Sequence, residues 1–281
     1  MIIVDMNQVM LSNLMMQLGN HTNAQLEENM VRHMILNSLR SYRNKFCAEY
    51  GEMIIACDNT NYWRKQLFPY YKANRRKATE NSELDWRQLF ECLNKIRAEL
   101  KEFFPYRVID IESAEADDII STLVRTYPME KILILSGDKD FIQLHSQGNV
   151  KQYDPTRKKW VAHENPDRYL MEHVLKGDSG DGVPNVLSPD NCFVVGERQK
   201  PLTQKKIDAL IELGLDGKYD HPLARNYMRN KQLIDLGHVP KEIAKKVVES
   251  YDSQTGKDRS KLLDYFIANR LKNLMENISE F

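Results

Sequence analysis

Short apolar runs alternate, in the N-terminal half of the chain, with longer segments in which apolar residues recur every three or four positions. The runs are residues 2–5, 53–58, 107–111 and 131–136. Apolar runs of this length predict buried β-strands, and the longer spacing around residues 26–35, 89–100 and 119–123 predicts amphipathic helices. Strands that alternate with helices indicate an α/β fold, with a mostly parallel sheet flanked by helices.

The pattern changes after Gly148. The next segment predicts a β-hairpin with its turn at residues 154–157, and helical spacing follows from Arg168 to the last residues. No stretch rich in glycine or proline separates the two parts, so a flexible linker is not expected. We therefore predict an α/β domain over residues 1–165 and a helical C-terminal domain over residues 166–281.

Acidic side chains gather where the predicted strands end. They are Asp5, Asp58, Glu115, Asp117, Asp118, Asp138 and Asp140, and two more, Asp178 and Asp181, lie in the sequence GDSGDG. The carboxyl ends of parallel strands share one edge of a sheet, so these carboxylates are expected to meet in one crevice. A single acid at such a place is often a turn former or a favourable charge at a helix start, but that explanation does not account for four successive segments.

Carboxylates that meet in this way repel one another unless a cation lies among them. Oxygen ligands without clustered His or Cys favour Mg²⁺ or Mn²⁺ over zinc, and the spread of the acids along the edge favours two ions. Glu115 and Asp118 are three residues apart and share a helix face, with Asp117 between them. Glu112 precedes this helix and is expected to be solvated.

A basic and aromatic segment follows the second strand. Residues 59–79 contain no acid, and they hold the cations Arg64, Lys65, Lys72, Arg75, Arg76 and Lys77 and the rings of Tyr62, Trp63, Phe68, Tyr70 and Tyr71. Cations interleaved with rings predict a surface that contacts phosphates and stacks on unpaired bases. The alternative is a solvated loop whose rings fill the core. Beside an acidic crevice, the first interpretation indicates metal-assisted cleavage of a nucleic acid.

Composition limits the remaining possibilities. The chain has 40 Lys plus Arg and 40 Asp plus Glu, which excludes a protein that binds nucleic acid through overall positive charge. The four Cys form no CxxC pair and the seven His have no metal-ligand spacing, so we expect reduced thiols and a cytoplasmic protein. No segment is apolar enough for a transmembrane helix, and the N-terminus lacks the positive charge of a secretory signal.

Five ordered motifs carry a resemblance to a known family. VDMNQ, ACDN with YWRKQLFPYYKANRRK, VIDIESAEADD, SGDKDFIQL and LKGDSGDGVPN resemble, in order and spacing, the flap endonuclease family of structure-specific 5′ nucleases, and phage members most of all. The resemblance implies a PIN-like nuclease lobe, two Mg²⁺ ions that Mn²⁺ can replace, and a helical arch at about residues 59–82.

The resemblance also implies roles for individual residues. It assigns Asp5, Asp58, Glu115, Asp117 and Asp138 to a first metal site, Asp140, Asp178 and Asp181 to a second, and Asp118 between the two. Catalytic roles are expected for Lys72, Arg75, Asp117 and Asp138. Contacts to nucleic acid are expected from the arch residues Arg64, Lys65, Tyr71, Lys72, Arg75, Arg76 and Lys77.

The activity that the resemblance implies is 5′ to 3′ hydrolysis, which removes RNA primers with adjacent DNA, or 5′ flaps, during phage DNA replication in the cytoplasm of an infected cell. The substrates would be RNA:DNA hybrids, duplex DNA with a 5′ end, and flap or fork DNA. Such nucleases often contact a sliding clamp and a single-strand DNA-binding protein, and we expect a monomer.

One departure from the family pattern affects DNA binding. The family often carries a glycine-rich helix-hairpin-helix after the last metal acids, whereas residues 182–189 read GVPNVLSP. Without the hairpin glycines, a close approach of the backbone to phosphate is less favourable. Lys200, Lys205 and Lys206 are the nearby cations.

Two other functions compete with nuclease activity. A metal-dependent phosphatase also places an Asp at the end of its first strand, but it needs a second Asp two residues later, where this chain has Asn7. A catalytically silent protein that binds branched DNA would tolerate gaps in the acid set, and the set is complete.

Overall fold

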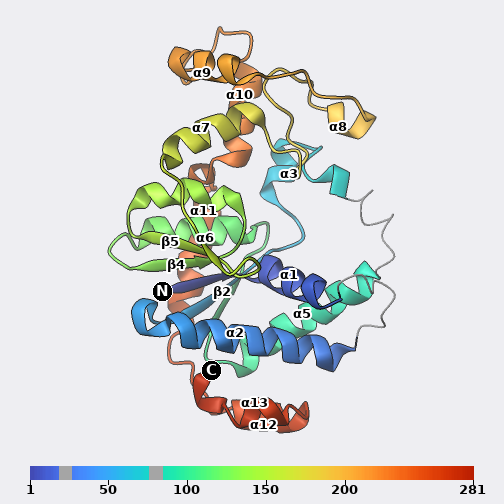
Figure 1. Cartoon of the computed structure of the whole chain (residues 1–281), viewed down its shortest axis with the longest axis vertical. Helices are drawn as coiled ribbons and strands as arrows, with labels where there is room; N and C mark the ends of the chain where they lie inside the picture. The colour runs from blue at the N-terminus through green and yellow to red at the C-terminus, as the bar shows by residue number, and fades with distance from the viewer. Residues whose placement is uncertain (19–26, 76–84) are drawn as a thin grey trace.

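The computed structural model describes residues 1–18, 27–75 and 85–281 (Figure 1). Its centre is a six-stranded sheet in the order β3-β2-β1-β4-β5-β6. The strands are β1 (Ile2–Asp5), β2 (Met53–Cys57), β3 (Arg107–Asp110), β4 (Ile132–Leu135), β5 (Val150–Asp154) and β6 (Lys159–Val161). All neighbours are parallel except β5 and β6, which form the predicted hairpin. The prediction of a mostly parallel α/β sheet is confirmed.

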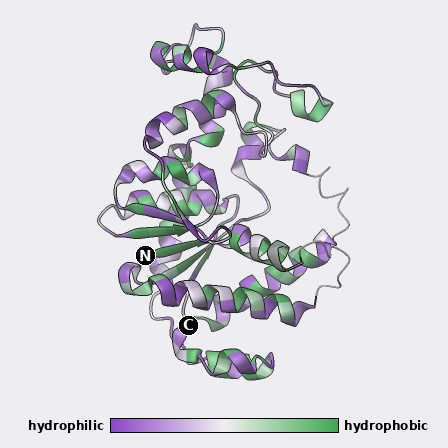
Figure 2. Cartoon of the chain, viewed as in Figure 1, coloured by the Kyte–Doolittle hydropathy of each residue, from purple (hydrophilic) through white to green (hydrophobic). Residues whose placement is uncertain are grey.

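The central strands are apolar on both faces, as Figure 2 shows by their green colour. Alternate residues of β1 point to opposite faces of the sheet, so Ile2 and Val4 join one core while Ile3 joins another. This double burial explains why the sequence shows continuous apolar runs and not an alternation of apolar and polar residues.

Helices cover both faces of the sheet. One face packs against α1 (Met6–Leu18), α2 (Glu28–Tyr50) and α5 (Trp86–Phe103), together with the end of the chain in α12 (Leu262–Ala268), α13 (Lys272–Met275) and η3 (Ile278–Glu280). The other face packs against α6 (Ala116–Thr126), η1 (Lys139–Gln147), η2 (Leu236–His238) and α11 (Lys241–Ser253). Each core therefore combines residues from both ends of the sequence.

A third apolar core lies beyond the carboxyl ends of the strands, near the top of Figure 1. Its helices are α7 (Pro166–Lys176), α9 (Gln204–Leu213) and α10 (Ala224–Ile234), and it includes Tyr62 and Phe68, which flank α3 (Trp63–Leu67). The short α8 (Cys192–Val195) lies in the same upper part of Figure 1. Phe68 and Tyr71 are buried in it, so the basic segment is joined to the helices after residue 166. The residues after 166 contribute to all three cores.

The predicted division near residue 165 remains a prediction. Within the ranges 1–18, 27–75 and 85–281, no helix has the length and apolar character needed to cross a bilayer.

Candidate metal centre and nucleic-acid interface

The first two strands end on carboxylates that neighbouring segments orient. Asp5 closes β1 and is only 5% exposed, and its Oδ2 accepts a hydrogen bond from Ser136 Oγ at 2.9 Å. Asp58 directly follows β2 and accepts from the backbone N–H of Ala116 and from Asn7 Nδ2, each at 2.7 Å. Asn7, at the position where a phosphatase needs an acid, therefore orients Asp58.

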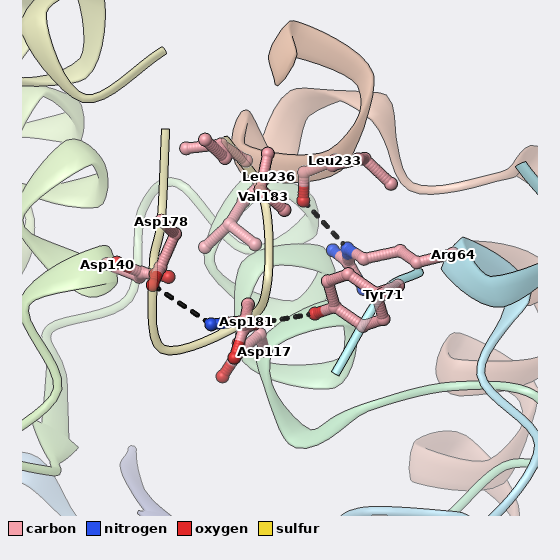
Figure 3. Close-up of a pocket in the computed structure, with 10 residues that line it drawn as sticks. Arg64, Tyr71, Asp117, Asp140, Asp178, Asp181, Val183, Leu233 and Leu236 are labelled. Atoms are coloured by element: carbon pink, nitrogen blue, oxygen red, sulfur yellow. Dashed lines mark hydrogen bonds between the residues drawn. The ribbon is translucent and has the colours of Figure 1, made fainter. Parts of the chain in front are cut away.

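The start of α6 brings the next acids to the same edge. Glu115 is the N-cap residue, and its backbone N–H donates to Asp118 Oδ2 at 2.9 Å in a capping box. Asp117 projects between them and lines the pocket drawn in Figure 3. Burial first, and then the nearby charges of Asp138 and Glu115, raise the pKa of Asp117 well above its usual value.

Asp138 lies between β4 and η1, and Asp140 lies in the first turn of η1. Asp138 is the N-cap of η1, and its Oδ1 accepts from the backbone N–H of Asp140 at 3.0 Å. The buried Gln152 of β5 holds this turn, because its Nε2 donates to the carbonyl oxygen of Ser136 at 2.9 Å. Sequence reasoning missed Gln152, because it stands between Lys151 and Asp154 in a strand of mixed polarity, and the sequence does not show that it is buried.

A compact loop supplies Asp178 and Asp181. Asp178 pairs with Val183 in an isolated antiparallel bridge, and Asp181 N–H donates to Asp178 Oδ1 at 3.1 Å (Figure 3). Gly177 has a φ of +69°, and a Cβ there would lie 2.4 Å from the carbonyl oxygen of Val183. Only glycine fits this position, and it closes the loop that presents both acids.

His173 is a member of the site that sequence reasoning missed. It lies on α7, between Asp140 and Asp178, and the ligand atoms of all three lie within 4.8 Å of one another. Burial lowers the pKa of His173, but the two acids outweigh it and raise the pKa above its ordinary value. Its partners come from segments about thirty residues upstream and five downstream, so no short-range His spacing reveals it.

The aromatic part of the basic segment is buried. Trp63 is 7% exposed, Phe68 3% and Tyr71 3%, so these rings fill a core as in the alternative interpretation. Arg64 is 2% exposed and is paired with Glu115 and Asp118, each at 2.8 Å.

Three predicted roles therefore need correction. Arg64 does not reach nucleic acid, because its guanidinium is enclosed between two acids and the carbonyl oxygen of Leu233, to which its Nε donates at 2.9 Å. Tyr71 is not a stacking surface, because its ring is buried and its hydroxyl donates to Asp181 at 2.8 Å. Asp118 is not placed as a metal ligand, because it is fully buried against Arg64 and Trp63 Nε1.

Lys72 and Arg75 do reach the acidic crevice. The Lys72 ammonium is bonded to Glu115 and lies 3.7 Å from Asp181 Oδ2, and the Arg75 guanidinium is bonded to Asp181. Lys72 N–H donates to the carbonyl oxygen of Asp181 at 2.7 Å, and Asn74 Nδ2 donates to that of Ser179 at 2.7 Å. The base of the predicted arch is thus fastened to the loop that carries the last two acids.

The other predicted arch contacts divide into two groups. Lys65 is exposed, with its ammonium 5.0 Å from the ring centroid of Tyr62. Arg76 and Lys77, like the rest of the predicted arch to residue 82, lie outside the described residues. Glu112 is exposed, as expected for a solvated acid.

The crevice carries more negative charge than its own cations neutralise. Burial, followed by repulsion from Asp58 and Asp138, raises the pKa of Asp5 to about 7. Burial, followed by Asp138, raises the pKa of Asp140 to about 7 as well. A divalent cation would relieve this repulsion, and the oxygen donors present suit a hard ion such as Mg²⁺.

Two family models match the chain. Residues 1–174 match the model described as 5'-3' exonuclease, N-terminal resolvase-like domain, and residues 165–281 match T4 RNase H, C terminal. The chain belongs to the 5′-3′ exonuclease family. The resemblance drawn from the five sequence motifs is thereby confirmed.

Individual relatives agree with this assignment. The chain is 36% identical to the ribonuclease H of Enterobacteria phage T4, over 99% of this chain and 95% of that protein. Its fold is similar to that of the T5 D15 protein co-crystallized with metal ions, with a TM-score of 0.63 and 17% identity over 91% of this chain and 99% of that one. A complex of the T5 D15 flap endonuclease with DNA and metal ions matches with a TM-score of 0.64, 18% identity and the same coverages.

Residues 182–189, which replace the glycine-rich hairpin of the family, are held by hydrogen bonds within the protein. Asn185 is buried, and it donates to the carbonyl oxygen of Lys200 at 2.8 Å and accepts from Ser188 Oγ at 2.9 Å. Arg229 and Asn230 both donate to the carbonyl oxygen of Pro184. The carbonyl oxygen of Pro184 is therefore already used by two side chains of α10 and is less available to a monovalent cation. The lysines named as substitutes, Lys200, Lys205 and Lys206, are exposed.

Proposed function

We propose that this protein is a divalent-metal-dependent, structure-specific 5′ to 3′ nuclease that removes RNA primers, adjacent DNA and 5′ flaps during phage DNA replication. The observation that carries the proposal is the convergence on one crevice of acids from β1, α6, the start of η1 and the loop at residues 177–183. Membership of the 5′-3′ exonuclease family supports the direction of hydrolysis.

The residues present fit two ions. Asp5, Asp117 and Asp138, with Asp58 beside them, would hold the first, and Asp140 with the acids of the loop at residues 177–183 would hold the second. Bound divalent ions activate water and stabilise the negative charge that develops on the phosphate and on the departing oxygen. Mg²⁺ is proposed because the donors are mostly carboxylate oxygens, and Mn²⁺ would substitute for it.

The protein's own cations would position the scissile phosphate. Lys72 lies between Glu115 of the first acid group and Asp181 of the second, where a phosphate that bridges the two groups would arrive. The Arg75 side chain is 57% exposed and lies at the entrance, so it can exchange a carboxylate for a phosphate oxygen. An open cavity of about 670 Å³, lined by Asp138, Asp140 and Ser179 among others, gives a nucleic acid access to the crevice.

The substrate would be a nucleic acid with a 5′ end, either an RNA:DNA hybrid or duplex, flap or fork DNA. The DNA complex of the T5 relative supports this proposal. We further propose that the protein acts as a monomer in the cytoplasm of an infected cell, alongside a sliding clamp and a single-strand DNA-binding protein.

Product sizing tests this function. A 5′-labelled flap and a nicked RNA:DNA duplex would be digested with Mg²⁺, with Mn²⁺ and with a chelator. We expect short 5′-labelled products from both substrates with either ion and none with the chelator. Tight binding of the flap without cleavage under every metal condition would show that the protein is a silent branched-DNA binder.

A further inference from the structure

The imidazole of His173 faces two carboxylates that come from different segments. Nδ1 lies 3.5 Å from Asp140 Oδ1, and Nε2 lies 3.7 Å from Asp178 Oδ2. Figure 3 shows these two carboxylates side by side at one end of the pocket. The His173 side chain is 13% exposed, so it belongs to the interior of the crevice and not to its rim.

The two separations are too long for direct hydrogen bonds, which for N–H···O span about 2.7–3.2 Å. The Nδ1–Asp140 separation of 3.5 Å matches that of two ligands that share one ion. With bonds of about 2.0–2.2 Å, two ligands of one metal lie about 3.0–3.5 Å apart, depending on the coordination angle. Nδ1 is buried, and among the residues that the structure describes it has no hydrogen-bond partner.

The helix that carries His173 is well fixed. Asn165 accepts the backbone N–H of Arg168 at 2.9 Å at the start of α7, and Pro166 occupies the first turn. The ring of Tyr169 lies one turn earlier, with its centroid 5.8 Å from that of His173. Val174 is buried in the third core. The imidazole is therefore held in place before any ion arrives.

We propose that His173 is a nitrogen ligand of the second ion through Nδ1, beside Asp140, and that this site prefers Mn²⁺ and other transition ions to Mg²⁺. The inference rests on the proposed function, because it refines one of the two metal sites. Imidazole suits transition ions, whereas Mg²⁺ favours oxygen donors. Nδ1 would bind the ion, and the N–H at Nε2 would face Asp178 Oδ2, an arrangement common around metal-bound histidine. The first site has carboxylates alone and lacks this preference.

The direct test is pulsed electron paramagnetic resonance of the full-length protein loaded with Mn²⁺. We expect modulation from a directly bound ¹⁴N nucleus in the wild type and its loss in His173→Gln. The control is His163→Gln, which removes an exposed imidazole beside the same Tyr169 and should leave the ¹⁴N signal unchanged. Wild-type spectra without bound ¹⁴N, or an unchanged signal in His173→Gln, would overturn the assignment.

Titration of the metal-free protein with Mn²⁺ and with Mg²⁺ measures which ion each site binds more tightly. His173→Gln should weaken one class of Mn²⁺ sites by about tenfold or more, leave the other class unchanged, and weaken Mg²⁺ less. Equal loss for both ions would contradict the selectivity. A wild type that binds no Mn²⁺ at all would remove the proposed metal-dependent function as well, whereas Mn²⁺ held by oxygen alone would remove only the role of His173.

Discussion

Replacement of Asp5 by asparagine should stabilise the metal-free protein at neutral and alkaline pH. The carboxylate is buried at the end of β1 and is repelled by Asp58 and Asp138, which together with burial raise its pKa from 3.8 to about 7. Asparagine keeps the shape of the side chain, and its one carbonyl oxygen can still accept the hydrogen bond from Ser136 Oγ, while the longer bond of 3.3 Å from Gln8 N–H is lost. The substitution therefore removes the unfavourable charge with little change in packing.

The magnitude follows from the size of the pKa change. A rise of about 3 units corresponds to about 4 kcal/mol, at about 1.4 kcal/mol per unit, and this is the largest gain that the substitution can give. Because the folded state binds this proton more tightly than the unfolded state, the wild type is not penalised below about pH 4, and it loses stability as the pH rises to about 7. The Asp5→Asn variant lacks that loss.

Thermal unfolding of metal-free protein at about pH 5 and about pH 8 measures the effect, and each kcal/mol should shift the melting temperature by about 2–4 °C. The variant should gain most at the higher pH. With saturating Mg²⁺ the wild type should have the higher melting temperature, since ion binding stabilises the wild type more than the variant, which lacks one ligand. A variant that is less stable than the wild type at both pH values without metal would refute the reasoning.

Three further substitutions test other parts of the site. Lys72→Ala should slow single-turnover cleavage by about 10²-fold, because phosphate positioning is lost while the metal ligands remain, and an unchanged rate would contradict its role. Gly177→Ala should lower the free energy of unfolding by about 1–3 kcal/mol or more and weaken metal binding at the second site. Gly148→Ala is the control, because Gly148 has a similar φ but free space for a Cβ. It should lower stability only through its strained backbone angle and leave metal binding unchanged. Arg64→Met should lower the free energy of unfolding by about 3–5 kcal/mol, because it leaves the buried Asp118 without its cation and Glu115 with Lys72 alone, and an unaltered melting curve would exclude that role.

The sheet and its acidic edge were predictable because both depend on local sequence. A strand buried on two faces must be a short apolar run, and the connections of a parallel sheet bring the ends of such runs to one edge. Asp5 and Asp138 could thus be placed together from residue order alone. The turn at residues 154–157 was equally local: Asp154 accepts backbone N–H groups from Thr156 and Arg157, each at 2.9 Å.

The burial of the basic segment depended on partners that the segment itself does not reveal. Arg64 reads as a surface cation until Glu115, Asp118 and the carbonyl oxygen of Leu233 surround it. His173 was overlooked for the same reason, because the direction of α7 decides which side chains it meets. Local spacing identifies acids at strand ends, but it does not identify contacts that depend on how helices and loops pack against one another.

Cleavage and binding of a 5′-labelled flap by Asp138→Asn, with Mg²⁺ present, test most directly the claim that the acidic edge is a metal-dependent catalytic centre. Glu112→Gln, which removes an exposed acid near the same edge, is the matched control. We predict that Asp138→Asn abolishes cleavage and leaves the dissociation constant for the flap nearly unchanged, while Glu112→Gln cleaves like the wild type. Retained turnover in Asp138→Asn would contradict the assignment of these carboxylates to the ions.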